Sequence, residues 1–305
     1  MPYAIVIHAF PRTNLPLAHA QGKILHGLFY ELLQNASAAK GDEVHGAEGL
    51  KPFSTALLLT ERQRHAEFIR AGEEVKIRFT FLDDALYPLL ARYFLSTPDL
   101  GFELVRTELT VTHILSTPQS GEEWAGCASF EELHANASHS EKQFSFHFAT
   151  PTFFKRGGGP TYPDLIVPLP LPDLVFGSLL RNWNQFSPTS FIEANLLKEI
   201  CSHHLEMTHH RISSQLARLV FQREGGQYRT TTFPGFVGAC SFRLVELHDP
   251  TIIKTLNALA DLAFYSGVGA KTTMGFGVSR RLKAEGLRER EKATGCRLKA
   301  KGEEQ

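Results

Sequence analysis

The strongest constraint on the fold is an order of strands and helices that occurs twice along the chain. Alternating residues in YAIVIHAF predict a strand, and apolar residues at helical spacing follow in LAHAQGKILHGLFYELLQNA. Two strands come next, PFSTALLLTE and EEVKIRFTFLD, then a helix, DALYPLLARYFL, and one alternating strand, GFELVRTELTVTHIL. The resulting order, βαββαβ, is that of the ferredoxin-like unit.

The same order starts again after a polar stretch at residues 116–142. QFSFHFATPTFF begins a strand, LPDLVFGSLLRNWNQF and FIEANLLKEICSHHL supply helices, and HRISSQLARLVF and GQYRTTTFPGFVGACSFRLV predict paired strands. A helix over 250–266 and a final strand close the unit. We therefore predict an α+β fold of tandem ferredoxin-like (RRM-like) domains, each βαββαβ with an antiparallel sheet. The domains cover residues 1–138 and 139–284, and residues 285–305 form a charged, disordered tail.

Charge and cysteine content exclude several classes of protein. The 305 residues carry a formal net charge of zero, so bulk charge gives no support for a polyanion partner and any nucleic-acid surface must be local. Four cysteines, Cys127, Cys201, Cys240 and Cys296, lie far apart without a C-x-x-C pair, which fits a reducing compartment. The sequence shows neither a secretion signal nor a membrane span, and we expect a cytoplasmic protein.

The stretch GVGAKTTMGFG holds glycines at 267, 269, 275 and 277. In phosphate-binding loops of nucleotide enzymes the glycines follow a strand and open a helix, whereas here a helix ends and a strand follows. This order argues against a nucleotide-binding enzyme. One glycine suffices to end a helix, so four glycines indicate a further close approach of backbone.

Two histidines and a lysine have the chemistry that RNA cleavage requires. His26 and Tyr30 share a helix face with His19 and Lys23, while His45 and Lys51 lie in the glycine-containing segment DEVHGAEGLKPF. A histidine transfers protons near neutral pH, and a lysine can neutralise the charge of a phosphorane. These parts suit attack by the RNA's own 2′-OH. The alternative is that each histidine is a surface or packing residue.

The histidine-rich stretch HHLEMTHH, residues 203–210, invites comparison with a metal site. Its spacing of six residues does not place ligands on one helix face, where i and i+4 are required. We favour a polar helix end that runs into a strand, and we predict no metal. No G-x-S-x-G elbow or paired-carboxylate pattern stands out either.

Five motifs in order resemble one protein family. They are G-x-x-x-H-x-x-F (Gly22 to Phe29), H-x5-K-P-F (His45 to Phe53), FHFATPTFF, GFVGACSF and the closing pair of G-x-G motifs after a helix. The set spans residues 22–277 and is similar to that of the CRISPR-associated endoribonucleases that cut precursor CRISPR RNA within its repeats, members of the repeat-associated mysterious protein superfamily. The same resemblance carries the tandem ferredoxin-like fold.

The resemblance implies metal-independent cleavage that needs no cofactor and leaves a 2′,3′-cyclic phosphate and a 5′-OH. By their motif positions, His26 and His45 become general acid and base, in an order left open, and Lys51 contacts the phosphate. The expected partner is CRISPR repeat RNA, with other subunits of a CRISPR effector complex or a second copy of the chain as further partners, and without DNA or a membrane.

Further RNA contacts are predicted on three segments and on Tyr30. The glycine-rich stretch is expected to meet the RNA backbone, the turn KRGGG (155–159) to grip a repeat hairpin, and two residues of a helix to meet phosphate. For the KRGGG turn the alternative is a solvated turn, and for the helix it is a solvent-facing pair of residues. The residues are Gly267, Gly269, Lys271, Thr272, Thr273, Gly275, Gly277, Lys155, Arg156, Tyr30, Ser178 and Arg181.

A competing function is a non-catalytic RNA-binding subunit of an effector complex with the same fold. The two hypotheses differ in what they require of His26, His45 and Lys51. A nuclease needs these side chains to converge, whereas a scaffold leaves them apart or packed away.

Overall fold

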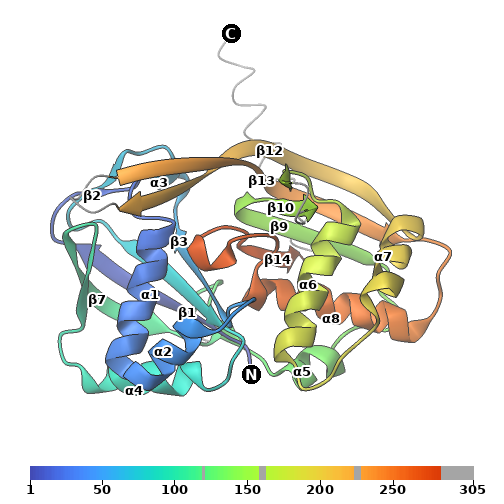
Figure 1. Ribbon diagram of the computed structural model, residues 1–305, viewed down its shortest axis with the longest axis horizontal. Coiled ribbons are helices and arrows are strands. Elements are labelled where there is room, and N and C mark those ends of the chain that lie inside the picture. Colours follow the sequence, from blue (N-terminus) through green and yellow to red (C-terminus); the bar gives the residue numbers. More distant parts are fainter. Residues whose placement is uncertain (119–120, 158–162, 223–227, 283–305) are drawn as a thin grey trace, which may run out of the picture.

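The computed structural model describes residues 1–118, 121–157, 163–222 and 228–282, and Figure 1 shows two sheets, each covered by helices. The first sheet has the strand order β3-β5-β1-β7-β6, and a short strand pairs with β1 outside this path. Every pairing in it is antiparallel. Its strands are β1 (Tyr3–Pro11), β3 (Phe53–Leu58), β5 (Val75–Phe81), β6 (Gly101–Leu104), β7 (Thr107–Leu115) and β8 (Gly126–Cys127).

Two helices cover the first sheet and a third extends the layer. They are α1 (Lys23–Ala36), α4 (Leu86–Ser96) and α2 (Ala38–Gly46), with small pieces at α3 (Glu61–Arg64), β2 (Leu15–Pro16) and β4 (Phe68–Ile69). α1 buries Leu25, Leu28, Phe29, Leu32 and Leu33, which recur every three or four residues and face the sheet. The helix begins at Lys23, so the predicted helical position of His19 is wrong. His19 lies in a turn before the helix, where its own N–H donates to the carbonyl of Pro16.

The second sheet has the order β12-β13-β9-β14, again fully antiparallel. Numbered along each unit, both sheets follow the same order 2-3-1-4, which confirms tandem ferredoxin-like domains. The strands are β9 (Gln143–Thr152), β12 (Leu205–Gln222), β13 (Tyr228–Leu244) and β14 (Ser279–Leu282), beside a hairpin of β10 (Phe154–Gly157) and β11 (Asp164–Val167). The helices are α5 (Phe130–Ala135), α6 (Pro172–Phe186), α7 (Ala194–His203), α8 (Pro250–Ser266) and the 3₁₀ turn η2 (Thr272–Met274).

One predicted strand is a hairpin. GFELVRTELTVTHIL forms β6 and β7, joined by Val105 and Arg106 with φ of 55° and 60°. A two-residue turn with both residues at positive φ normally selects Gly or Asn, so the sequence carries no turn signal here. Alternation continues across the turn, and the segment therefore has the pattern of one strand.

The two domains are joined by direct packing. Arg78 of β5 is 1% exposed and donates to the carbonyls of Trp124 and Phe264 at 2.9 and 2.6 Å. Phe130 of α5 packs edge-on against Trp183 of α6, so the end of the segment assigned to residues 1–138 packs on the second domain. The boundary at residue 138 stays a prediction, and the predicted tail over 285–305 lies outside the described residues.

The long β12–β13 hairpin connects the domains on another side. Figure 1 shows it extending from the second domain across the top of the molecule to the first. A Cβ on Gly22, the N-cap of α1 with φ of 72°, would lie 3.0 Å from the backbone N of Val220. Lys23 places its ammonium 4.7 Å from the ring centroid of Phe221. The start of α1 is thus held against β12.

Candidate active site

His26 lies where the first helix meets the glycine-rich stretch of the other domain. Its Nδ1 is 3.0 Å from the carbonyl oxygen of Thr273, and its ring stacks on Phe53 at a centroid distance of 5.5 Å. A carbonyl oxygen can only accept, so Nδ1 carries the proton and the neutral ring has its lone pair on Nε2. Within the described part of the chain, Nε2 has no hydrogen-bond partner.

Burial lowers the pKa of His26 below its ordinary value of 6.5. The hydrogen bond to Thr273 opposes this shift, while the charges of Lys23, Lys51 and His45 add to it. His26 is therefore neutral at pH 7 and can accept a proton at Nε2.

His45 lies close to His26, and Tyr30 stands between the two histidine rings. Tyr30 contacts each ring edge-on, at centroid distances of 4.9 Å to His26 and 5.1 Å to His45. Its hydroxyl donates to the carbonyl of Val44 at 3.4 Å, which ties α1 to α2. His45 is exposed, at the last turn of α2. Tyr30 thus has a structural task beside its predicted contact with RNA.

Lys51 joins this group by closing the end of α2. Its ammonium donates to the carbonyls of Val44 and His45, each at 2.9 Å, and to that of Ala47. These bonds use all three of its N–H groups. A cation at a helix C-terminus is stabilising, and here it also fixes the turn that carries His45. Lys51 thus has a structural role that the spacing did not suggest, and its contact with phosphate stays a prediction.

Three glycines of GVGAKTTMGFG serve internal packing, and the contact of these glycines with RNA stays a prediction. A Cβ on Gly277 would lie 2.1 Å from the carbonyl of Val268, and one on Gly269 would lie 2.5 Å from that of Phe153. The N–H groups of Gly267, Gly269 and Gly277 donate to Ala263, Ser178 and Pro151. These three N–H donors are therefore occupied within the protein.

The tip of the same stretch touches the first domain. η2 lies between two left-handed residues, Lys271 with φ of 61° and Gly275 with φ of 92°. Its Thr273 carbonyl accepts from His26 and from the hydroxyl of Thr55, each at 3.0 Å. The glycine-rich stretch thus positions His26, a role that the sequence had not indicated.

A groove of about 920 Å³ runs from this point along α6 and the β10–β11 hairpin. Of the described residues that line it, one, Asp173, is acidic and six are basic: Lys51, Lys155, Arg156, Arg181, Lys198 and Lys271. We refer to it as the basic groove. His26 and His45 do not line it, but Thr273 and Lys51, which contact them, do. The groove therefore leads to the two histidines.

Most predicted RNA contacts of the second domain meet in this groove. Lys155 pairs with Asp164 at 2.6 Å and Arg156 with Asp173 at 3.1 Å, and both are exposed. Burial is the main cause that lowers the pKa of Lys271, and the nearby charges of Lys155 and Lys23 lower it further. Residues 158–162 of the predicted turn lie outside the described residues.

Ser178 has a structural role beside its predicted contact with phosphate, which stays a prediction. It is 2% exposed, and its hydroxyl accepts the N–H of Gly269 at 2.9 Å, so it braces the glycine-rich stretch from below. Arg181, one turn further along α6, is exposed in the basic groove. Lys198 of α7 was not predicted, because no motif surrounds it and only the packing of α7 on α6 brings it to the groove.

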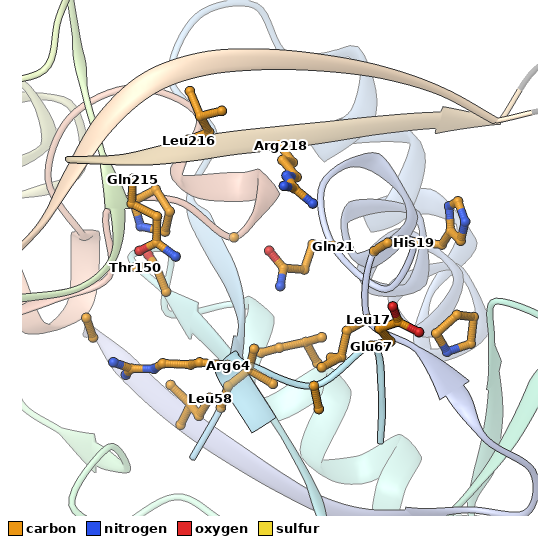
Figure 2. Close-up of a pocket in the computed structure, with 18 of the residues that line it drawn as sticks. Leu17, His19, Gln21, Leu58, Arg64, Glu67, Thr150, Gln215, Leu216 and Arg218 are labelled. Carbon is orange, nitrogen blue, oxygen red and sulfur yellow. The ribbon is translucent and has the colours of Figure 1, made fainter. Parts of the chain in front are cut away.

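A second groove of about 1070 Å³ lies between the domains under the long hairpin. Figure 2 shows Arg64 and Arg218 on opposite walls, with Gln21 and Gln215 between them. Two acidic residues, Glu67 and Glu123, offset these arginines. This groove is electrostatically less suited to RNA phosphates than the basic groove.

The stretch HHLEMTHH is a helix end followed by a strand, as predicted. α7 ends at His203 and β12 begins at Leu205. The described residues include no cluster of three or more His, Cys, Asp or Glu side chains that could hold a metal ion.

Among the described residues, no helix has the length and apolar character needed to cross a membrane.

Comparison with known proteins places both halves of the chain in one family. The model of the CRISPR Cas6 N-terminal domain matches residues 1–135, and that of the CRISPR-associated endoribonuclease Cas6 matches residues 146–279. No curated protein matches significantly.

Solved structures agree with the family models. A product complex of Thermus thermophilus Cas6 (TTHB231) has 31% identity and a TM-score of 0.77, over 92% of this chain and 100% of that chain. A product complex of Cas6 (TTHA0078) has 27% identity and a TM-score of 0.66, over 93% of this chain and 100% of that chain. A substrate mimic complex of the same protein has 26% identity and a TM-score of 0.64, over 92% of this chain and 99% of that chain. The chain therefore belongs to the Cas6 family of CRISPR-associated endoribonucleases, which confirms the resemblance carried by its histidine and glycine motifs.

Proposed function

We propose that this protein cleaves precursor CRISPR RNA within its repeats by internal transesterification. The ribose 2′-oxygen forms a bond to phosphorus, and the bond from phosphorus to the 5′-oxygen breaks. The products are a 2′,3′-cyclic phosphate and a 5′-OH. Because the nucleophile belongs to the RNA, no water has to be activated and the mechanism requires no metal ion.

The observation that carries this proposal is the hydrogen bond from His26 Nδ1 to the Thr273 carbonyl. It leaves Nε2 of a neutral imidazole as the acceptor, so we assign His26 as the general base that takes the 2′ proton. His45, across Tyr30, is the acid that protonates the departing 5′-oxygen. Lys51 adds positive charge beside both, which stabilises the phosphorane.

The basic groove is the surface that we propose for the repeat RNA. Similar Cas6 structures are complexes with product or with a substrate mimic, and in this chain six cations lead to the catalytic histidines. Each phosphate neutralised by Lys or Arg releases counterions, so the binding constant should fall as salt rises.

The cleavage chemistry is tested with the cognate repeat RNA in excess chelator. We expect full cleavage, a 5′-OH that accepts phosphate from polynucleotide kinase, and a 3′ end that resists ligation until the cyclic phosphate is opened. A matched RNA with a single 2′-deoxy substitution at the scissile nucleotide should bind equally and stay intact. Cleavage of the deoxy RNA, or loss of activity in chelator, would contradict the mechanism.

The groove is tested by salt-dependent RNA binding. Arg181→Ala and Lys198→Ala should each weaken binding and reduce the slope of log K against log salt by about one. Arg92→Ala, an exposed arginine on α4, is the matched control and should change neither. Equal effects in all three variants would show that the RNA does not follow the basic groove.

A further inference from the structure

The carbonyl oxygen of Thr273 is shared by two donors from the first domain. His26 Nδ1 and Thr55 Oγ1 each lie 3.0 Å from it. A carbonyl oxygen has two lone pairs, so both donors bind at once. The direction of this one carbonyl therefore depends on Thr55 as well as on its own turn.

Strand β3 supplies one side chain that contacts His26 and a second that contacts its hydrogen-bond acceptor. Side chains alternate along a strand, so Phe53 and Thr55 share a face. Phe53 stacks on the imidazole, and Thr55 reaches the carbonyl that the imidazole binds. Thr55 is 1% exposed, so water does not compete for its hydroxyl.

We propose that Thr55 is a positioning residue, whose hydroxyl fixes the Thr273 carbonyl and through it holds His26 as the tautomer with its proton on Nδ1. The inference rests on the proposed role of His26 as proton acceptor. A neutral imidazole can carry its proton on either nitrogen, and only a well-placed acceptor at Nδ1 favours one of them. A ring with its proton on Nε2 cannot take the 2′ proton there.

The direct test measures the tautomer by ¹⁵N NMR of histidine-labelled protein at a pH where His26 is neutral, with His26→Ala used to assign its signals. We expect the Nδ1–H form in the wild type. Thr55→Val keeps the shape and removes the hydroxyl, and should raise the Nε2–H form to a comparable population. Thr55→Ser keeps a hydroxyl and should restore the Nδ1–H form. An unchanged tautomer in Thr55→Val would overturn the proposal.

Cleavage kinetics give the second readout. Thr55→Val should lower the single-turnover rate about tenfold, a part of the full contribution of a general base, with RNA binding unchanged and with recovery in Thr55→Ser. Ser54→Ala is the matched control, because Ser54 is the neighbouring buried hydroxyl of β3 and bonds Thr80 at 2.6 Å. It should lower the melting temperature without altering the tautomer. A rate loss in Ser54→Ala as large as in Thr55→Val would count against positioning.

A second variant reaches the same carbonyl from the other domain. Gly275→Ala places a side chain at φ of 92° in open space, where only the carbonyl of Thr55 lies as near as 4.0 Å. It should turn η2 and shift the tautomer as Thr55→Val does, and it serves if Thr55→Val does not fold. If the wild type does not cleave repeat RNA, the proposed function fails while the tautomer still tests Thr55. If the wild type cleaves and Thr55→Val folds but keeps the wild-type tautomer, only the positioning role fails.

Discussion

His26 depends on contacts from both domains, since Phe53 and Tyr30 come from the first and the Thr273 carbonyl from the second. Its replacement should affect proton transfer more than RNA binding, because it does not line the basic groove. We expect His26→Ala to slow single-turnover cleavage about 100-fold or more, and to change the RNA dissociation constant less than about threefold. Quench-flow cleavage and filter binding measure the two effects.

The matched control for this variant is His65→Ala. His65 is exposed and forms an ion pair with Glu61 at 3.5 Å. The His65→Ala variant should cleave at the wild-type rate. Equal rates for His26→Ala and the wild type would remove His26 from the mechanism.

The pH dependence of cleavage follows from the burial of His26. Burial lowers the pKa of His26, the proposed base, below 6.5, so its proton-accepting form persists as pH falls and is lost only below that value. The acidic limb of kcat/KM, which reports the free enzyme, should therefore lie below pH 6.5. Lys23→Gln removes one of the charges that lower this pKa, so the limb should move to higher pH, whereas Lys254→Gln on α8 should leave it in place. A limb above pH 6.5 in the wild type would contradict the assignment of His26 as base.

At the scale of elements, the glycine-rich stretch shows how backbone packing supports the site. Gly277→Ala brings a Cβ within 2.1 Å of a carbonyl oxygen, whereas Gly275→Ala adds only the strain of a left-handed backbone. We expect the free energy of unfolding to fall by about 1 kcal/mol for Gly275→Ala and by about 3 kcal/mol or more for Gly277→Ala. Urea unfolding measures both. Similar losses would mean that the stretch relaxes around the added methyl group.

The elements themselves were largely predictable, because their patterns are local. The amphipathic helices α1, α6 and α8 and the paired strands β12 and β13 follow the periodicity of the sequence. The β6–β7 turn was missed because Val105 and Arg106 adopt positive φ without Gly or Asn.

The candidate site was predictable only where motifs mark it. His26, His45 and Lys51 follow from motif spacing, and the structure brings them together around Tyr30 and the end of α2. Thr55 has no such signal, because its partner Thr273 lies 218 residues away in sequence. The contact of Ser178 with Gly269 has no sequence signal either, because only the fold brings the two residues together.

At the scale of the whole molecule, the proposed role of His26 makes cleavage depend on how the two domains are held, because the bond from His26 to Thr273 crosses between them. Arg78 is a buried polar contact of this interface, because it donates to the carbonyl of Phe264 in the second domain. Its guanidinium lies 4.6 Å from the ring centroid of Phe264 and 5.4 Å from that of Trp124, and donates to the carbonyl of each residue. Burial lowers the pKa of Arg78 to about 9, so it remains charged at neutral pH.

Arg78→Ala should therefore weaken the fold and, beyond that, loosen the active site. It leaves two buried carbonyls without their donor and a cavity between aromatic rings, so we expect a loss of about 3–5 kcal/mol in urea unfolding. Leu90→Ala is the matched control, because Leu90 is buried in the first domain away from the interface and its truncation should cost about 2–5 kcal/mol. At a temperature where both variants are fully folded, Arg78→Ala should cleave repeat RNA more slowly than Leu90→Ala, because Arg78 lies at the domain interface, whereas Leu90 lies in the core of the first domain. Equal cleavage rates would show that the His26 contact forms independently of Arg78.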